Sequence, residues 1–299
     1  MKPKATVIIA LLLLSALFCH QARSEHSQGL RLVTTIFPLT ELVRAIVSDE
    51  AEVFQLIPTS AEVHTWQLRP GDLKNLAAAD ILICIGGDFE PWLTKIDSTL
   101  DKKKTRIISF YDYLISIDYD GIRPGDPHLW LDFQADSLFV KKILEELEAI
   151  KPRNKELCRR RAEELVNQLG SLDREYKELL THCPQKELII AGHEAFGYLA
   201  SRYGLRQIAL TGSSPEAQPS PRQLQEIVNL IRAKKVRTIF FESSTPQAYA
   251  RVIARETGAE LCGLSTGVNL TRPELENKTG FIELMKRNLE ILRKGLSCE

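Results

Sequence analysis

The segment "KELCRRRAEELVNQLGSLDREYKELL", residues 155–180, decides the fold because similar patterns lie on both sides of it. It is rich in helix-forming residues. Its apolar residues recur mostly at intervals of three or four, at Leu157, Ala162, Leu165, Leu169, Leu172 and Tyr176. This spacing predicts one amphipathic helix, which only Gly170 weakens. Such a helix, about 26 residues long, would span nearly 40 Å. That is longer than one small domain needs, so we predict a strut that joins two lobes.

Strand and helix patterns alternate before and after this segment. The expected strands are "RLVTTIF", "EVFQLIP", "DILICIGG" and "TRIISF" before it, and "ELIIAG", "RQIAL", "VRTIFF" and "AELCGL" after it. Amphipathic helical stretches lie between them, an alternation typical of βαβ units and parallel sheets. The predicted fold class is therefore α/β, with two lobes of mainly parallel sheet joined by one long rigid helix. The predicted division is an N-terminal lobe over 30–150, a linking helix over 153–182 and a C-terminal lobe over 185–299.

The first 24 residues, "MKPKATVIIALLLLSALFCHQARS", have the parts of a secretory signal peptide. Two lysines precede an apolar run from Ala5 to Cys19, and the small-residue pattern "ARS" follows. The run is about 15 residues long, whereas a bilayer span needs roughly 20. We expect cleavage near Ser24 and export as a soluble protein. Lipid attachment at Cys19 is less expected, because the bulky Phe18 precedes it.

Export would leave the cysteines in an oxidising compartment, which permits disulfides. Cys262 with Cys298 is the favoured pair, since it would staple the C-terminal tail to a strand. Cys158 and Cys183 lie near opposite ends of the predicted helix, about 37 Å apart and too distant to bond. Cys84 lies in an apolar strand pattern and is expected to be a free buried thiol. The sequence has no CxxC or Cys/His cluster that would indicate a structural zinc module.

The charge balance excludes one class of partner. Lys+Arg and Asp+Glu number 39 each. A nucleic-acid-binding protein typically carries a basic excess to neutralise phosphates. We therefore expect no nucleic acid as a partner.

Four polar residues follow expected strands, where ligands of open α/β sheets bind. His193 and Glu242 directly follow "ELIIAG" and "VRTIFF", His64 lies after "EVFQLIP", and His128 lies in the long loop region after "TRIISF". Each histidine alone is more often a surface or hydrogen-bonding residue, and His128 could equally pack beside Trp130. Three converging neutral imidazoles with an open fourth position would instead form a Zn²⁺ site. The sequence alone does not place the lobes relative to one another.

Four segments in this order resemble the metal-binding solute-binding proteins of bacterial zinc and manganese ABC transporters. They are "PTSAEVHTWQLRPGDLKNLAAADILICIGGDFEPWL", "DPHLWLDF", "AGHEAFGYLASRYGL" and "IFFESSTPQAYARVIARETGAEL". The resemblance covers essentially the whole mature chain. It implies two α/β lobes joined by a long rigid helix, with the metal in the cleft between them. The family's ligand positions fall on His64, His128 and His193.

The resemblance also indicates which metal to expect. Zinc members of the family tend to have a histidine at the third position, and three imidazoles suit Zn²⁺ better than Mn²⁺, which is the second choice. Many relatives add an acidic ligand after the last strand, but "ELCGLSTGVNL" offers none here. Glu242 is the best-placed candidate for a fourth ligand, although it could equally hold an imidazole N–H. No histidine lies between His64 and His128, so the metal-collecting histidine-rich loop of many zinc members is absent.

The function implied is capture of a divalent metal, zinc first, in the periplasm and its delivery to the membrane permease of an ABC transporter. The protein would act as a monomer and not as an enzyme. The main alternative is a secreted zinc hydrolase, for which three histidines and a water would serve as well. Against it, "HEAFG" contains the acid Glu194 but lacks the second histidine of an HExxH motif.

Overall fold

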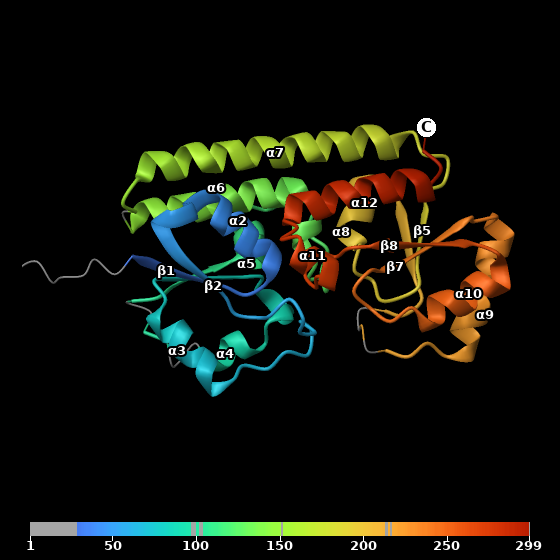
Figure 1. Ribbon diagram of the computed structural model, residues 1–299, viewed down its shortest axis with the longest axis horizontal. Coiled ribbons are helices and arrows are strands. Elements are labelled where there is room, and N and C mark those ends of the chain that lie inside the picture. Colours follow the sequence, from blue (N-terminus) through green and yellow to red (C-terminus); the bar gives the residue numbers. More distant parts are fainter. Residues whose placement is uncertain are drawn as a thin grey trace, which may run out of the picture.

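The computed structural model describes residues 29–96, 100–101, 104–150, 152–212, 215 and 217–298. Within these residues the chain forms two α/β lobes with one long helix lying across both of them (Figure 1). The predicted fold class is confirmed. The predicted signal peptide, residues 1–24, lies outside the described residues.

The N-terminal lobe is built on a parallel sheet with the strand order β2-β1-β3-β4. Its four strands fall where the sequence predicts them. The elements are β1 (Leu30–Thr34), α2 (Phe37–Val47), the 3-10 turn η1 (Ser48–Glu50), β2 (Ala51–Gln55), α3 (Pro70–Ala78), β3 (Ile81–Cys84), η2 (Gly87–Phe89), α4 (Trp92–Ile96), β4 (Arg106–Ser109), α5 (Phe110–Ser116), η3 (Leu129–Leu131) and α6 (Phe133–Ala149).

The C-terminal lobe repeats this arrangement in a second parallel sheet, with the order β6-β5-β7-β8. Its strands also match the prediction. The elements from the long helix onward are α7 (Lys155–Thr181), β5 (Glu187–Ile190), α8 (Gly197–Arg202), β6 (Arg206–Ala209), α9 (Pro221–Lys234), β7 (Thr238–Glu242), α10 (Ala248–Thr257), β8 (Glu260–Leu264), α11 (Arg272–Glu276) and α12 (Phe281–Gly295).

The strand order places a crevice at the carboxyl ends of β5 and β7. The first strand of each lobe lies between the second and the third, so the direction of winding reverses beside it. Loops leave the sheet on opposite sides at such a point, which opens a space for a ligand. In the second lobe this point lies between β5 and β7, and His193 and Glu242 stand at these two strand ends.

The long helix α7 buries the face that its periodicity predicts. Ala162, Leu165, Leu169, Leu172 and Tyr176 are buried, as expected, whereas Leu157 is only half-buried. The Asn154 side chain caps the helix by accepting a hydrogen bond from the Leu157 N–H at 3.1 Å. The helix is not a lone strut, because α6 and α12 lie along it and contact it (Figure 1). Of the described helices, only α7 runs over both lobes, as predicted, while α6 lies along its N-terminal half and α12 along its C-terminal half.

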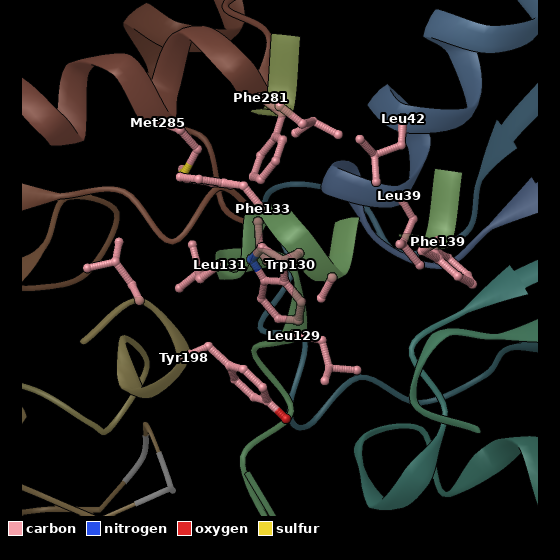
Figure 2. Close-up of a cluster of buried hydrophobic side chains, with 14 of the residues drawn as sticks. Leu39, Leu42, Leu129, Trp130, Leu131, Phe133, Phe139, Tyr198, Phe281 and Met285 are labelled. Carbon is pink, nitrogen blue, oxygen red and sulfur yellow. The ribbon is translucent and has the colours of Figure 1, made fainter. Parts of the chain in front are cut away.

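A single apolar core runs from one lobe into the other. Figure 2 shows Trp130 at its centre, with Leu39 of α2 on one side, Tyr198 of α8 on another, and Phe281 and Met285 of α12 above. Each lobe has a smaller separate cluster on the outer face of its own sheet. Separating the lobes would expose this shared core to water at roughly 25 cal/mol per Å² of apolar surface. The two halves of any site between them are therefore held at a defined distance.

The disulfide prediction is wrong in one partner. Cys298 bonds Cys183 rather than Cys262, with Cα atoms 4.1 Å apart. The reason is that α12 returns along α7 and ends beside the end of α7, where Cys183 lies. Cys262 lies half-buried in β8 as a free thiol. Cys84 is free and buried, as predicted.

In the part of the chain that the structure describes, no helix combines the length and the apolar character that a bilayer crossing requires.

Candidate metal centre

The three histidines singled out from the sequence meet at one place. The ligand atoms of His64, His128 and His193 all lie within 4.8 Å of one another. The centres of their rings are 5.2–5.4 Å apart in each pair. His64 comes from the loop after β2, His128 precedes η3, and His193 follows β5. The cluster therefore joins two segments of the first lobe to one of the second.

Asp126 fixes the ring of His128. Its Oδ1 lies 2.8 Å from His128 Nδ1 and also accepts a hydrogen bond from the His128 backbone N–H at 3.1 Å. Burial alone would raise the pKa of Asp126, but the hydrogen bonds from His128, joined by one from Arg123, outweigh it and leave the pKa below its ordinary value. An ionised carboxylate can only accept, so Nδ1 of His128 carries the proton. His128 is 3% exposed.

Glu242 holds His193 in the same way. Its Oε1 lies 2.6 Å from His193 Nδ1, and both side chains are buried. The contact exists because β5 and β7 are neighbouring strands whose carboxyl ends face the same edge of the sheet. The sequence pointed to Glu242 either as a fourth ligand or as a partner for an imidazole N–H. The structure shows the second contact, and the ligand role stays a prediction.

The free nitrogens of these two rings have the spacing of metal ligands. His128 Nε2 and His193 Nε2 lie 3.4 Å apart. With both protons on Nδ1, each Nε2 presents a lone pair, and neither ring can donate to the other. Two nitrogens bound at about 2.0–2.1 Å to a tetrahedral ion are also about 3.4 Å apart. The distance between the two nitrogens therefore matches that between two ligands of one tetrahedral ion.

His64 completes the cluster but is held more loosely. It is half-buried and contacts Phe89 edge-to-face, with ring centres 5.3 Å apart. Its backbone N–H donates to Glu62 Oε1 at 3.1 Å. Among the residues that the structure describes, none gives its ring nitrogens a hydrogen bond. Burial, and then the neighbouring His128 and His193, lower the pKa of His64 to about 3. The ring is thus neutral at ordinary pH, as a ligand must be.

The walls of the cavity explain what else an ion there could contact. Besides the histidines, the lining residues are Glu62, Val63, Trp130, Glu242, Thr266, Val268 and Asn269. The loop after β8 thus contributes no acid, in agreement with its sequence. Glu194 is exposed and lines a different pocket, beside Arg123 and Asp126.

Sequence reasoning missed the role of Asp126 as the hydrogen-bond partner of His128. A signal was available, because Asp side chains often bond the backbone two residues onward. It also missed Asn269 and the contact of the Trp130 indole with the Thr266 carbonyl, at 2.7 Å. Both depend on a loop that lies far away in the sequence, and no local pattern indicates them.

Comparisons with known proteins identify the family of this chain. The family described as zinc-uptake complex component A, periplasmic (ZnuA), matches residues 32–295. The zinc-binding lipoprotein AdcA of Streptococcus pneumoniae is 30% identical over 312 residues, which cover 100% of this chain and 62% of AdcA. The high-affinity zinc uptake system protein ZnuA of Bacillus subtilis is 30% identical over 288 residues, covering 91% of this chain and 90% of that protein. The chain thus spans less than two thirds of AdcA but nearly all of the Bacillus protein.

Solved structures show the same fold. The Zn(II)-bound ZnuA-like domain of Streptococcus pneumoniae AdcA superposes with a TM-score of 0.78 at 32% identity, covering 90% of this chain and 99% of that one. The laminin-binding adhesin Lmb of Streptococcus agalactiae, in a mutant form, gives 0.79 at 29% identity, covering 90% and 100%. The family that the sequence motifs resemble is therefore confirmed: with residues 32–295 matched, this chain belongs to the ZnuA family of periplasmic zinc-uptake components.

Proposed function

We propose that this protein captures a divalent metal ion, zinc first, at His64, His128 and His193 and delivers it to the permease of an ABC transporter. The observation that carries the proposal is the pair of Nε2 atoms 3.4 Å apart on two rings whose Nδ1 atoms face carboxylates. Membership of the zinc-uptake family and the zinc-binding names of the AdcA and ZnuA relatives support it.

Zinc is preferred to manganese on the chemistry of the donors. Three imidazoles suit Zn²⁺, whereas Mn²⁺ favours more oxygen ligands. The carboxylates in the cavity wall, Glu62 and Glu242, are already hydrogen-bonded to a backbone N–H and to His193. We propose that Glu242 orients His193 and that a water completes a four-coordinate site. Manganese remains the second candidate.

Binding without catalysis fits the surroundings of the histidines. A zinc hydrolase needs a general base beside the metal-bound water. Glu194, the acid that the sequence offers for this role, is exposed outside the cavity. The coordinating groups are instead enclosed by Val63, Trp130 and Val268, which leave little room for an organic substrate.

We extend the proposal to the domain division, the partners and the location. Residues 30–150 and 185–299 would act as the two lobes of a monomeric carrier, with residues 153–182 as the linking helix. Export with cleavage near Ser24 is our first hypothesis, and lipid attachment at Cys19 is the second. AdcA of Streptococcus pneumoniae is itself named a lipoprotein. The intact mass of the mature protein distinguishes these two hypotheses. Lipid attachment would retain Cys19 and add the mass of the acyl chains, whereas cleavage near Ser24 would remove Cys19.

The function is tested by zinc titration of the metal-free protein in competition with a chelator. We expect one zinc per chain, bound more tightly than Mn²⁺ at pH 7.5 and weakly at pH 5, because imidazoles must be neutral to coordinate. His128→Ala should lose this binding, while His182→Ala, at the exposed end of α7, should retain it. A parent protein without a zinc site, or a His128→Ala variant that binds like the parent, would overturn the proposal.

A further inference from the structure

The β8–α11 loop (residues 265–271) is anchored firmly to the C-terminal lobe. The buried side chain of Asn288 on α12 accepts from the Ser265 N–H at 2.9 Å and donates to the Ser265 carbonyl at 2.7 Å. Gly267 then adopts φ +78°, and a Cβ there would lie 2.9 Å from the Phe281 ring. Only glycine tolerates both the backbone angle and the close approach. The loop therefore has a fixed base and a fixed turn.

From this base the loop reaches the segment that carries His128. The Thr266 carbonyl accepts a buried hydrogen bond from the Trp130 indole N–H at 2.7 Å. Trp130 stands two residues after His128, and their ring centres are 5.2 Å apart. A hydrogen bond in this buried setting would be costly to leave unmade. The loop thus helps to place the His128 segment of the first lobe against the second.

The same loop reaches the segment that carries His64. The Asn269 Nδ2 donates to the Thr59 carbonyl at 3.0 Å and to the Ala61 carbonyl at 2.6 Å. Thr59 and Ala61 belong to a turn in which the Ala61 N–H donates a hydrogen bond to the Pro58 carbonyl oxygen at 2.9 Å. Both N–H groups of the Asn269 carboxamide therefore donate, and both hydrogen bonds connect the C-terminal lobe to the N-terminal lobe. His64 follows this turn by three residues and shares its cavity with Asn269.

We propose that Asn269 is a positioning residue for His64. Unlike the other two imidazoles, His64 has no carboxylate on its ring among the described residues, so its place depends on the path of its backbone. Asn269 fixes that path by latching the turn before His64 onto the C-terminal lobe. The latch keeps the third ligand in place and slows the escape of a bound ion. This inference rests on the proposed function, that the three histidines bind zinc.

The test compares Asn269→Leu with the matched control Asn229→Leu. Leucine is close to asparagine in size but has no donor, and Asn229 is exposed on α9, away from the cavity. Stopped-flow mixing of zinc-loaded protein with excess chelator measures release, and mixing of metal-free protein with zinc measures uptake. Loss of two hydrogen bonds should speed release in Asn269→Leu roughly tenfold. Uptake should stay within about twofold, because binding-rate changes are usually small. The control should match the parent in both.

A second readout reports on the ligand itself. Co²⁺ in place of zinc gives visible absorption bands that depend on ligand geometry, and these should change in Asn269→Leu and not in the control. Release within about twofold of the parent, or unchanged Co²⁺ bands, would overturn the positioning role, even if the unfolding midpoint fell. If the parent protein bound no zinc, the proposed function itself would be contradicted. The Asn269–Thr59 hydrogen bond would then not position a metal ligand.

Discussion

His128 and His193 are held differently from His64. The first two are buried, and each Nδ1 faces a carboxylate, at 2.8 Å and 2.6 Å. His64 is half-buried, touches Phe89, and has a hydrogen bond on its backbone N–H but, among the described residues, none on its ring. The difference separates two tasks that one site must perform. In the proposed site, the preset pair His128 and His193 would define where an ion sits, while the third ligand, His64, lies on a loop.

The preset pair draws on the rigid parts of the fold. A carboxylate on Nδ1 fixes the tautomer and makes the opposite nitrogen a better donor to a metal. Burying Asp126 and Glu242 costs solvation, which is offset only while their hydrogen bonds are made. The pair is therefore stable as a unit. It sits at the end of the shared core around Trp130, to which both lobes contribute.

The largest effect should come from removing a member of the preset pair. His128→Ala or His193→Ala should weaken zinc binding at least about 100-fold, beyond what loss of an orienting partner typically costs. His64→Ala should cost less, because the two fixed nitrogens remain. Chelator-competition titrations at pH 7.5 rank the three variants. If His64→Ala costs as much as His128→Ala, the distinction between a preset pair and a closing ligand is wrong.

A smaller effect should follow from keeping the rings but changing their partners. Asp126→Asn and Glu242→Gln should each weaken zinc binding roughly 10–100-fold, because the imidazole is no longer held in the right tautomer. Glu194→Gln is the matched control, since Glu194 is exposed and outside the cavity. The same titration compares all three. Parent-like affinity in Asp126→Asn would show that the carboxylate does not orient His128.

The smallest effect concerns His64 and the pH dependence of stability. Its pKa in the folded chain is about 3, below the ordinary value of about 6.5. Between these values the unfolded chain binds a proton that the folded chain does not, so stability is full above pH 6.5 and falls as pH drops toward 3. Urea unfolding of the metal-free protein at pH 7.5 and 5 should show a loss that is smaller by about 1–2 kcal/mol in His64→Gln. Equal losses in parent and variant would mean that His64 is not buried in the metal-free state.

The elements were predictable because they depend on local patterns. The spacing of Leu165, Leu169 and Leu172 indicated α7, and short β-branched runs indicated the strands. The three histidines were found because ligands gather at the carboxyl ends of parallel strands. The resemblance to the family's motifs then indicated that these three histidines occupy its ligand positions. Each of these inferences needed only residues close together in the sequence.

The contacts that complete the site were not predictable in this way. Glu242 meets His193 only because β5 and β7 become neighbours, and Asn269 meets Thr59 across 210 residues. Cys298 was assigned to the wrong partner for the same reason. Its true partner depends on α12 running back along α7, and periodicity shows which face of a helix is buried but not what it is buried against. These features follow from the way whole elements pack.

The bond between Cys183 and Cys298 joins residues 115 apart and makes the C-terminal lobe a closed covalent ring. A protease that cuts once inside this ring opens it but releases nothing. The segment that carries His193 and the loop that carries Asn269 would stay in one molecule, joined to α7, until a reductant arrived. A nicked chain would therefore migrate intact on a gel without reductant and as two pieces with it. In a compartment where proteases are common and reductants scarce, such a ring would let the lobe that carries His193 and Asn269 survive a single cut.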